Sequence, residues 1–479
     1  MKIFNGKIFS YSRNNKVVNI ALILFLVMSL LGITSTVVFE KKTEYSFKKL
    51  FFESHAPMLT IERTGLFTME VLDVERYIFG FEEKMDLGED EPDEPIIVEP
   101  VYEPNVLNID FDTLIEKTTN KKVLQLHKYF KTVEPTYKNK YTGLFKDKNL
   151  IFITAEGFDA IAVDENLTPT LYKMANNGYV FKNYYQPLFT VSTSDGEYMN
   201  LTSLVPKEGV WSFYRSSNIY LPFGIGRMFK NAGYETVNAY HDHTYSFYDR
   251  DKSHPNLGFD KYVGCGNGLE KLINCKIWPE SDIEMIDATI NDYINSETFM
   301  TYYMTVSGHL NYSFNDNMMA YKNKDLVKDL PYSNNVKAYI ASNIELDHAL
   351  EKLINYLTET DKLDDTVIVL SPDHYPYGLK DNELNEVSKT DRSDKFEKFH
   401  TSLIIYNSEI EKPIKVSKYV SSIDVLPTVY NLFGIEYDSR LLMGTDAFSD
   451  SRHFAALCFK RFSNSWNIFA FKNKSFVTN

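Results

Sequence analysis

The sequence predicts an α/β fold, a doubly wound, mostly parallel sheet with helices on both faces, preceded by one transmembrane helix. The first observation is a series of short apolar runs, separated by helix-like stretches, that begins near Asn149. Runs of this kind, without polar alternation, are typical of parallel strands buried on both faces. The second observation is an uncharged apolar stretch of membrane-spanning length near the N-terminus.

The apolar runs and the turn residues between them define the expected elements. A helix is expected to begin at Thr168-Pro169 and to be closed by Gly178, and Val336–Leu357 repeats apolar residues at helical spacing. The expected strands are Asn149–Thr154, Glu235–Tyr240, Phe299–Val306, Thr366–Leu370 and Ser402–Tyr406. In such a sheet, ligands bind beyond the carboxyl ends of the strands.

Residues Ile20–Phe39 carry no charge and, at about 1.5 Å per helical residue, are long enough to cross a hydrocarbon core. A cleavable signal peptide has a shorter apolar region ending in small residues, whereas this run ends in Val-Val-Phe. An uncleaved anchor is therefore favoured. Basic residues lie on both sides of the run, so the positive-inside rule does not fix its orientation. An extracellular catalytic domain is inferred from the chemistry below.

Composition suggests how the rest of the chain is divided. Residues 82–105 are acidic and proline-rich, which opposes a packed core and favours an extended linker. The expected segments are a cytoplasmic tail at 1–18, the transmembrane helix at 19–39, a juxtamembrane helical segment at 40–81, the linker at 82–105, a connecting helical segment at 106–148 and the catalytic domain at 149–479.

Charge and cysteine content exclude some classes of protein. The formal net charge of −14 argues against a nucleic-acid binder, which needs a basic face. Three cysteines do not make a disulfide scaffold. Cys265 and Cys275 are compatible both with a disulfide and with two free thiols.

Metal-binding and phosphate-binding residue types follow four of the expected strands. Glu156, His241 and His309 each lie where a strand ends, and Asp373-His374 follow a fourth strand. Since the carboxyl ends of parallel strands meet at one edge of the sheet, these side chains are expected to lie close together. Oxygen and nitrogen ligands together suit Mn²⁺, Mg²⁺ or Zn²⁺, and the absence of thiolates argues against a structural zinc site. Asp373 and His374 are adjacent, so both can reach one ion only if the chain has turned out of the strand.

The nucleophile candidate is Thr193, in the sequence Val-Ser-Thr-Ser-Asp-Gly-Glu at residues 191–197. Ser194 and Glu197 have capping-box spacing, so a helix is expected to begin just after Thr193. A helix N-terminus favours an anion, and a divalent ion bound to the threonine oxygen would activate it. A cap without a catalytic role is the alternative. The role of Arg250 also has two interpretations. Its guanidinium either makes a bidentate contact with a phosphate or forms a surface ion pair.

Together these residues resemble lipoteichoic acid synthases and related phosphoglycerol transferases, within the alkaline phosphatase and sulfatase superfamily. The resemblance covers about Tyr141 to Phe448 and depends on the order and spacing of five motifs. They are Asn-Leu-Ile-Phe-Ile-Thr-Ala-Glu-Gly-Phe (149–158), Thr-Ser-Asp (193–195), Ser-Phe-Tyr-Asp-Arg (246–250), Ser-Gly-His (307–309) and Asp-His-Tyr (373–375).

The resemblance implies a reaction and a set of site residues. Thr193 would attack the phosphorus of phosphatidylglycerol, release diacylglycerol and pass glycerophosphate to a polyglycerolphosphate or glycolipid acceptor at the membrane. The implied ligands of one Mn²⁺-type ion are Glu156, Thr193, Asp373 and His374. The residues implied to hold the phosphoglycerol head are His241, Tyr248, Arg250 and His309.

The chain also departs from that family. Its longer members carry about five membrane spans, whereas one is expected here. Tyr248 stands where members often have tryptophan, and the sequence assigns no role to Asp242 and His243.

Three other functions compete with this interpretation. A sulfatase activity would require a Cys/Ser-x-Pro-x-Arg motif, which the Thr193 segment lacks. A phosphoethanolamine transferase would also use a threonine and a metal, but its extracellular domain usually carries several disulfides. A non-catalytic envelope protein of the same fold is disfavoured by the intact set of ligand types.

Overall fold

The chain is described by a computed structural model, and the described part divides into two units, Met1–Pro100 and Val101–Asn479. The described residues are 20, 23–24, 27, 60–62, 66–80, 102–207, 209–394, 396–451, 456–462, 465–472 and 475–477. In the first unit, helix α4 spans Leu66–Phe79. The expected membrane span at 19–39 lies almost entirely outside the described residues. Among those described, no helix has both the length and the apolar character that crossing a membrane requires.

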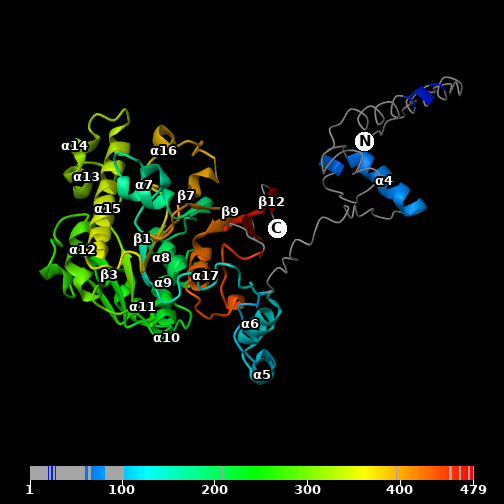
Figure 1. The fold of residues 1–479 in the computed structure, drawn as a ribbon, viewed down its shortest axis with the longest axis horizontal. Coiled ribbons are helices and arrows are strands. Elements are labelled where there is room, and N and C mark those ends of the chain that lie inside the picture. Colours follow the sequence, from blue (N-terminus) through cyan, green and yellow to red (C-terminus); the bar gives the residue numbers. More distant parts are fainter. Residues whose placement is uncertain are drawn as a thin grey trace, which may run out of the picture. The chain divides into compact units, whose positions relative to one another are not determined.

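A nine-stranded sheet organises the second unit (Figure 1). Its order is β4-β3-β5-β1-β6-β8-β2-β7, and β9 pairs with β2. The strands are β1 (Asn149–Ala155), β2 (Tyr179–Tyr185), β3 (Thr236–Thr244), β4 (Lys261–Cys265), β5 (Phe299–Met304), β6 (Thr366–Pro372), β7 (His400–Thr401), β8 (Ile404–Tyr406) and β9 (Ile414–Ser421). All pairs from β4 to β6 are parallel, and β8 is antiparallel to both its neighbours.

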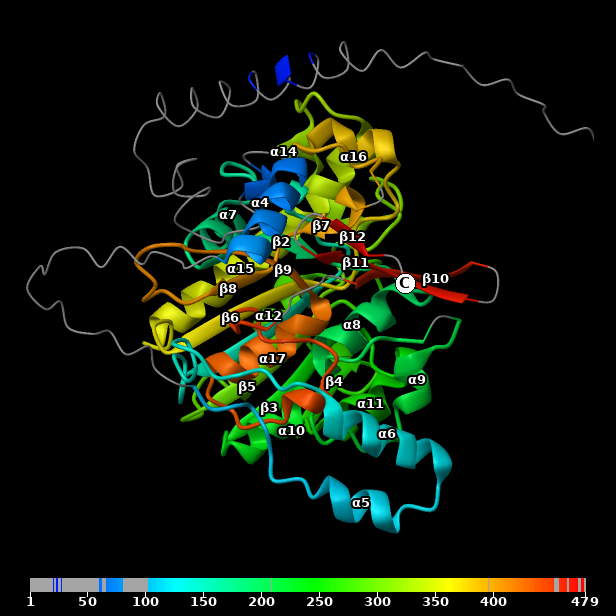
Figure 2. The ribbon, with the colours of Figure 1, turned by 90° about the vertical axis from the view of Figure 1, so that its right-hand side faces the viewer.

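Helices cover both faces of this sheet, as Figures 1 and 2 show from two directions. The helices whose apolar residues join one core include α7 (Pro169–Asn176), α12 (Asp282–Thr289) and α15 (Asn334–Glu359). Those of the other core include α8 (Ser192–Thr202), α10 (Ile225–Asn231) and α17 (Ser422–Leu432). The remaining helices are α5 (Phe111–Lys117), α6 (Lys121–Thr132), α9 (Ser212–Ser216), α11 (Arg250–Leu257), α13 (Met318–Lys322), α14 (Lys324–Val327) and α16 (Asp381–Val387). A separate sheet contains β10 (Ala456–Phe462), β11 (Ser465–Lys472) and β12 (Ser475–Val477).

The central strand β1 shows why its sequence is apolar without alternation. Ile151 and Ile153 belong to the core with α15, whereas Leu150 and Phe152 belong to the core with α8 and α17. Successive side chains of a strand point to opposite faces, so a sheet covered on both faces needs apolar residues at every position. The predicted α/β fold is therefore confirmed.

Two details of the sheet differ from expectation. Strand β3 continues beyond Tyr240 to Thr244, so His241 lies within the strand; the pairing with β4 is irregular between Tyr240 and Thr244. The antiparallel strands β7 and β8 are short, and the expected strand from Ser402 begins only at Ile404. Cys265, the last residue of β4, forms a disulfide with Cys275, which resolves the choice that the sequence left open.

Candidate functional site

The carboxyl edge of the parallel strands brings the expected site residues together. Glu156 directly follows β1, and Asp373 directly follows β6, which pairs with β1 up to Ala155 and Pro372. His241 of β3 is paired with Met304, the last residue of β5. Residues 307–309 lie just beyond that strand. The sheet register therefore aligns four segments that are distant in sequence.

Glu156, Asp373 and His374 form a compact group of metal-ligand types. One ligand atom from each lies within 4.8 Å of the others, and all three residues are buried. Nε2 of His374 lies 3.3 Å from Oε1 of Glu156 and 3.2 Å from Oδ2 of Asp373. Neither of these oxygens accepts a hydrogen bond within the described residues. Buried carboxylate oxygens that lack donors and face one imidazole nitrogen fit a divalent cation.

The hydroxyl of Thr193 reaches the same group. Its Oγ1 donates a hydrogen bond to Oε2 of Glu156 at 3.0 Å and lies 3.4 Å from Nε2 of His374. Helix α8 begins two residues earlier than expected, at Ser192, so Thr193 lies in its first turn. The expected capping box is wrong, because no side chain caps this helix and Glu197 is paired with Arg250 instead. The hydroxyl still lies at the positive end of an 11-residue helix.

Two glycines allow the backbone segments of the site to approach closely. A Cβ on Gly196 of α8 would lie 1.9 Å from the carbonyl oxygen of Asp373. A Cβ on Gly308 would lie 2.2 Å from the carbonyl oxygen of Glu156. Both contacts are with backbone atoms that cannot rotate away, so any side chain at either position would displace a predicted metal ligand or the loop bearing His309.

The electrostatics of the group follow from burial and close charges. Burial alone would raise the pKa of Glu156, but the neighbouring charges of His309 and His374 hold it far below its usual range. Burial opposes the charged form of His374, yet Asp373 and Glu156 raise its pKa to about 9. Burial and the charge of Glu156 raise the pKa of Asp373. A bound cation would compete with protons for the ligand atoms of these three residues.

Arg250 is held in the buried interior next to the site. Its Nε donates to Oε2 of Glu197 at 2.9 Å, and its Nη1 donates to Nε2 of His241 at 3.3 Å. Tyr302 donates to the other oxygen of Glu197 at 3.0 Å, and His254 lies 3.3 Å from it. Burial alone would raise the pKa of Glu197, but Arg250 lowers it to about 2. The alternative of a surface ion pair is therefore wrong, since both partners are buried.

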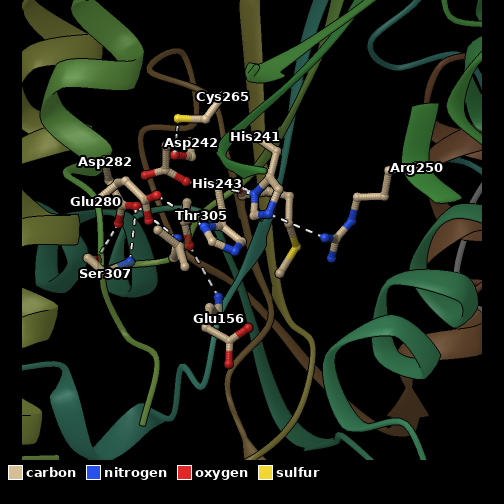
Figure 3. A network of polar contacts seen from close by, with 12 residues as sticks. Glu156, His241, Asp242, His243, Arg250, Cys265, Glu280, Asp282, Thr305 and Ser307 are labelled. Atoms are coloured by element: carbon tan, nitrogen blue, oxygen red, sulfur yellow. Dashed lines mark hydrogen bonds and ion pairs between the residues drawn. The ribbon is translucent and has the colours of Figure 1, made fainter. Parts of the chain in front are cut away.

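The guanidinium keeps one donor available, because Nη2 of Arg250 is buried without a hydrogen bond among the described residues. Figure 3 shows Arg250 directed toward His241, with Glu156 nearby. Burial and the charge of Arg250 lower the pKa of His241, so its ring is neutral. Its Nδ1 donates to the Met304 carbonyl at 2.9 Å, and Nε2 accepts from Arg250. The bond to Met304 thus holds the His241 ring, and its Nε2 contacts Arg250.

Tyr248 and His309 border the group from two loops. Tyr248 has a positive φ of 61°, and its ring lies 5.3 Å from the Arg250 guanidinium carbon. Burial raises the pKa of Tyr248, and the charge of Arg250 lowers it by less. The negative charges of Glu156 and Asp373 raise this pKa further. The His309 ring packs against Trp278, with centroids 4.8 Å apart.

Asp242 and His243, which the sequence left unassigned, belong to a buried acidic network shown in Figure 3. Nδ1 of His243 lies 3.0 Å from Oε1 of Glu280. Asp282 accepts hydrogen bonds from the backbone amides of Val306 and Ser307, at 3.0 and 3.2 Å. Burial and the charge of Asp282 raise the pKa of Asp242. This network fixes the loop that leads to His309.

Sequence reasoning missed the residues that support the predicted site residues. Glu197 carried a signal, its spacing from Ser194, but that spacing suggested a cap rather than a partner of Arg250. No sequence signal pointed to Tyr302, His254 or Asp282, because each acts through partners that are distant along the chain. Gly308 did carry a signal, since it directly precedes His309 in a glycine-containing motif.

Comparisons with known proteins show what this chain is similar to. The sulfatase family matches residues 148–435. Lipoteichoic acid synthase 2 of Bacillus subtilis is 25% identical over 342 residues, which cover 68% of this chain and 51% of that protein. Lipoteichoic acid synthase of Staphylococcus saprophyticus is 27% identical over 337 residues, covering 67% of this chain and 50% of that protein. The chain thus spans about half the length of the curated relatives it matches.

Solved structures share the fold. Lipoteichoic acid synthase LtaP of Listeria monocytogenes superposes with a TM-score of 0.60 at 22% identity, covering 73% of this chain and 90% of that one. A protein of the alkaline phosphatase superfamily from Vibrio parahaemolyticus gives a TM-score of 0.54 at 19% identity, covering 76% and 88%.

Proposed function

Because the chain belongs to the sulfatase family, we propose that it is a metal-dependent phosphoglycerol transferase that uses Thr193 as its nucleophile. It would move glycerophosphate from phosphatidylglycerol to a polyglycerolphosphate or glycolipid acceptor. One observation carries the proposal: Oγ1 of Thr193 lies 3.0 Å from Glu156 and 3.4 Å from His374, at the start of helix α8. The relatives named lipoteichoic acid synthase support the same chemistry.

Glu156, Thr193, Asp373 and His374 would hold one divalent cation, for which Mn²⁺ is proposed and Mg²⁺ or Zn²⁺ are alternatives. The support is the donor set itself, two carboxylates, an imidazole and a hydroxyl gathered in a buried space. When bound, the cation supplies positive charge that lowers the pKa of the Thr193 hydroxyl and neutralises phosphoryl oxygens.

In the first half-reaction, Oγ1 of Thr193 attacks the phosphorus of phosphatidylglycerol. The new P–O bond forms as the bond from phosphorus to the diacylglycerol oxygen breaks. The threonine proton leaves and diacylglycerol departs as an alcohol, so protons balance. The N-terminus of α8 favours the negative charge that gathers on the phosphoryl oxygens.

In the second half-reaction, an acceptor hydroxyl attacks the same phosphorus, and the bond to Oγ1 of Thr193 breaks. The hydroxyl proton is lost and a proton returns to Thr193. Arg250 would contact the phosphoglycerol head through its unpaired Nη2, and His241 would orient Arg250. Tyr248 and His309 would border the head from two sides. Such reactions depend mainly on positioning and charge neutralisation.

The setting of this activity is also a proposal. We place the enzyme in the cell membrane, anchored by residues 19–39, with the catalytic domain at 149–479 outside the cell. A lipid donor and the Cys265–Cys275 disulfide are both consistent with an extracellular domain.

Membership of the sulfatase family does not imply sulfate-ester hydrolysis. The residue at the metal group is Thr193, whose segment lacks the proline and arginine that formylglycine formation needs. A phosphoethanolamine transferase would share the threonine and the metal, and the donor lipid distinguishes the two.

The decisive assay measures diacylglycerol release by the full chain in detergent with Mn²⁺. We expect release from phosphatidylglycerol at a rate at least tenfold above that from phosphatidylethanolamine. The reverse preference would identify a phosphoethanolamine transferase. Release from neither lipid, with folded and metal-loaded protein, would contradict a transferase that uses these donors.

A further inference from the structure

Four buried carboxyls gather behind the loop that bears His309. None of the four residues is more than 2% exposed. They are Asp242 of β3, Glu280 just before α12, Asp282 at the start of α12 and Glu345 of α15. Figure 3 shows the first three of them close together. The steps of the proposed reaction use none of these carboxyls, so their concentration in the interior has another cause.

Basic groups close to these carboxyls neutralise only part of their charge. Glu345 pairs with Nζ of Lys322 at 2.9 Å. Oε1 of Glu280 lies 3.0 Å from Nδ1 of His243. The remaining two carboxyls form no ion pair with a lysine or arginine in the part of the chain that the structure describes. Because a buried charge without a partner costs several kcal/mol, two such carboxyls in contact do not both ionise.

Hydrogen bonds identify which of these two carboxyls carries the negative charge. Asp282 accepts from the backbone amides of Val306 and Ser307, at 3.0 and 3.2 Å, and from the hydroxyl of Ser307. Neither carboxyl oxygen of Asp242 accepts a hydrogen bond from the described residues, yet this carboxyl is within hydrogen-bonding reach of Asp282. Three donors stabilise an ionised Asp282, whereas a carboxyl that has no donor and faces a carboxylate keeps its proton and donates it. Burial, and then the charges of Asp282 and Glu280, raise the pKa of Asp242 well above its usual range.

The neighbouring groups on β3 and β4 leave Asp242 without a countercharge. Nδ1 of His241 lies 3.7 Å from Oδ1 of Asp242, but this nitrogen donates to the carbonyl of Met304. Burial and the charge of Arg250 lower the pKa of His241 and keep its ring neutral. The buried hydroxyl of Tyr262 on β4 is neutral too, since burial raises its pKa. An ionised Asp242 would favour a protonated His241, whose Nε2 could then no longer accept a hydrogen bond from Arg250.

We propose that Asp242 is kept as a neutral carboxylic acid that donates its proton to Asp282, and that this shared proton positions the loop bearing His309. Asp282 holds two amides and a hydroxyl of that loop, so any movement of its carboxylate moves the loop. Loss of the shared proton would place two negative charges in contact and push Asp282 away from Asp242. The head-group role of His309 rests on the proposed function, whereas the protonation of Asp242 does not.

Infrared difference spectra of the full chain in detergent test the proton directly, without turnover. At about pH 8 we expect wild type to show the C=O band of a protonated carboxylic acid that is missing in Asp242→Asn. Asp242→Ser lacks the carboxyl as well and gives a second, independent difference spectrum. Asp446→Asn is the matched control, because Asp446 is also buried but, with a pKa of about 7, is mostly ionised at this pH. Spectra that lose no such band in either variant of Asp242 would overturn the proposal.

Kinetics with phosphatidylglycerol test the positioning role. The amide of Asp242→Asn can still donate to Asp282, so we expect kcat/KM within twofold of wild type. Asp242→Ala has no donor, and we expect its KM to rise at least fivefold with a smaller change in kcat. In a His309→Ala background the effect of Asp242→Ala should shrink below twofold. Equal kcat/KM values for Asp242→Asn and Asp242→Ala, or an effect that persists without His309, would refute the positioning role.

The two tests separate this proposal from the proposed function. If wild type cleaves no lipid but the infrared band is lost in the variants of Asp242, the transferase fails and the shared proton stands. If lipid is cleaved and the band is unchanged in those variants, the transferase stands and the shared proton is refuted.

Discussion

The hydroxyl of Thr193 donates to the carboxylate of Glu156 at 3.0 Å, although 37 positions separate the two residues. Glu156 directly follows strand β1 and Thr193 lies in the first turn of helix α8, so the contact depends on the packing of that helix against the carboxyl edge of the sheet. A hydroxyl at a helix N-terminus that touches a metal-ligand group has the setting that an activated nucleophile requires.

Replacement of Thr193 tests the nucleophile. Thr193→Ala removes the attacking oxygen, and we expect diacylglycerol release to fall on the order of a thousandfold or more. Ser192→Ala removes the adjacent hydroxyl, which accepts a hydrogen bond from Tyr377 at 3.3 Å, and should retain more than half of the activity. Initial rates with saturating Mn²⁺ provide the measurement. Comparable losses in both variants would indicate damage to the helix start instead.

Loss of a carboxylate ligand tests the metal group. Glu156→Gln removes a negative charge from a site built on two carboxylates, so we expect Mn²⁺ affinity to fall by at least tenfold. Isothermal titration of metal-free protein measures it. Glu165→Gln, an exposed carboxylate elsewhere in the domain, is the control. Wild-type affinity in Glu156→Gln would remove Glu156 from the ligand set.

The buried pair of Arg250 and Glu197 predicts a cost in stability. Glu197→Gln leaves the guanidinium buried without its countercharge, and we expect a loss of about 3 kcal/mol in the free energy of unfolding. Tyr302→Phe keeps the pair and removes one hydrogen bond, so it should cost about 1 kcal/mol. Urea denaturation distinguishes the two. A smaller loss for Glu197→Gln than for Tyr302→Phe would contradict the proposed pairing.

Gly196 predicts a steric effect on the site. Gly196→Ala places a Cβ 1.9 Å from the Asp373 carbonyl oxygen, so Asp373 must shift and metal affinity should fall. Gly178→Ala makes a similar clash, 2.3 Å from the Ile405 carbonyl oxygen, but lies away from the metal group. Both variants should lose stability, and only Gly196→Ala should bind Mn²⁺ more weakly as folded protein. Equal affinities would contradict this dependence on close packing.

Two buried carboxyls predict how stability changes with pH. Burial raises the pKa of Asp424 and of Asp446 to about 7 each, whereas an unfolded aspartate titrates near 4. Between these values the folded protein binds more protons, so the free energy of unfolding should fall as pH rises from about 4 to about 7. Asp446→Asn should flatten that decline in urea titrations, and exposed Glu411→Gln should not. An unchanged slope in Asp446→Asn would show that its pKa is not raised.

The central parallel strands β1, β5 and β6 could be predicted because they are mostly apolar and are buried along their whole length, which few other environments permit. The same rule placed Glu156, His309 and Asp373 at one edge, since strand ends in a parallel sheet coincide. Strand β8 was predicted with a start two residues early, at Ser402, whereas strand β7 could not be predicted, because two residues carry no periodicity.

The supporting contacts could not be predicted for a different reason. Glu197 has the spacing of a capping box, and only the fold shows that its carboxylate meets Arg250, 53 positions later. Tyr302 lies 105 positions from Glu197, and its apolar strand context gives no sign of that hydrogen bond. Long-range polar pairing depends on how helices pack on the sheet, which local sequence patterns do not encode.

The most direct test of the account is the mass of the peptide that carries Thr193 after the full chain is incubated with phosphatidylglycerol and Mn²⁺ and quenched in acid. We expect an added glycerophosphoryl group on Thr193, and we expect it to be absent when the cation is chelated beforehand. Diacylglycerol release with unmodified Thr193 throughout the reaction, or with the group on another residue, would contradict it.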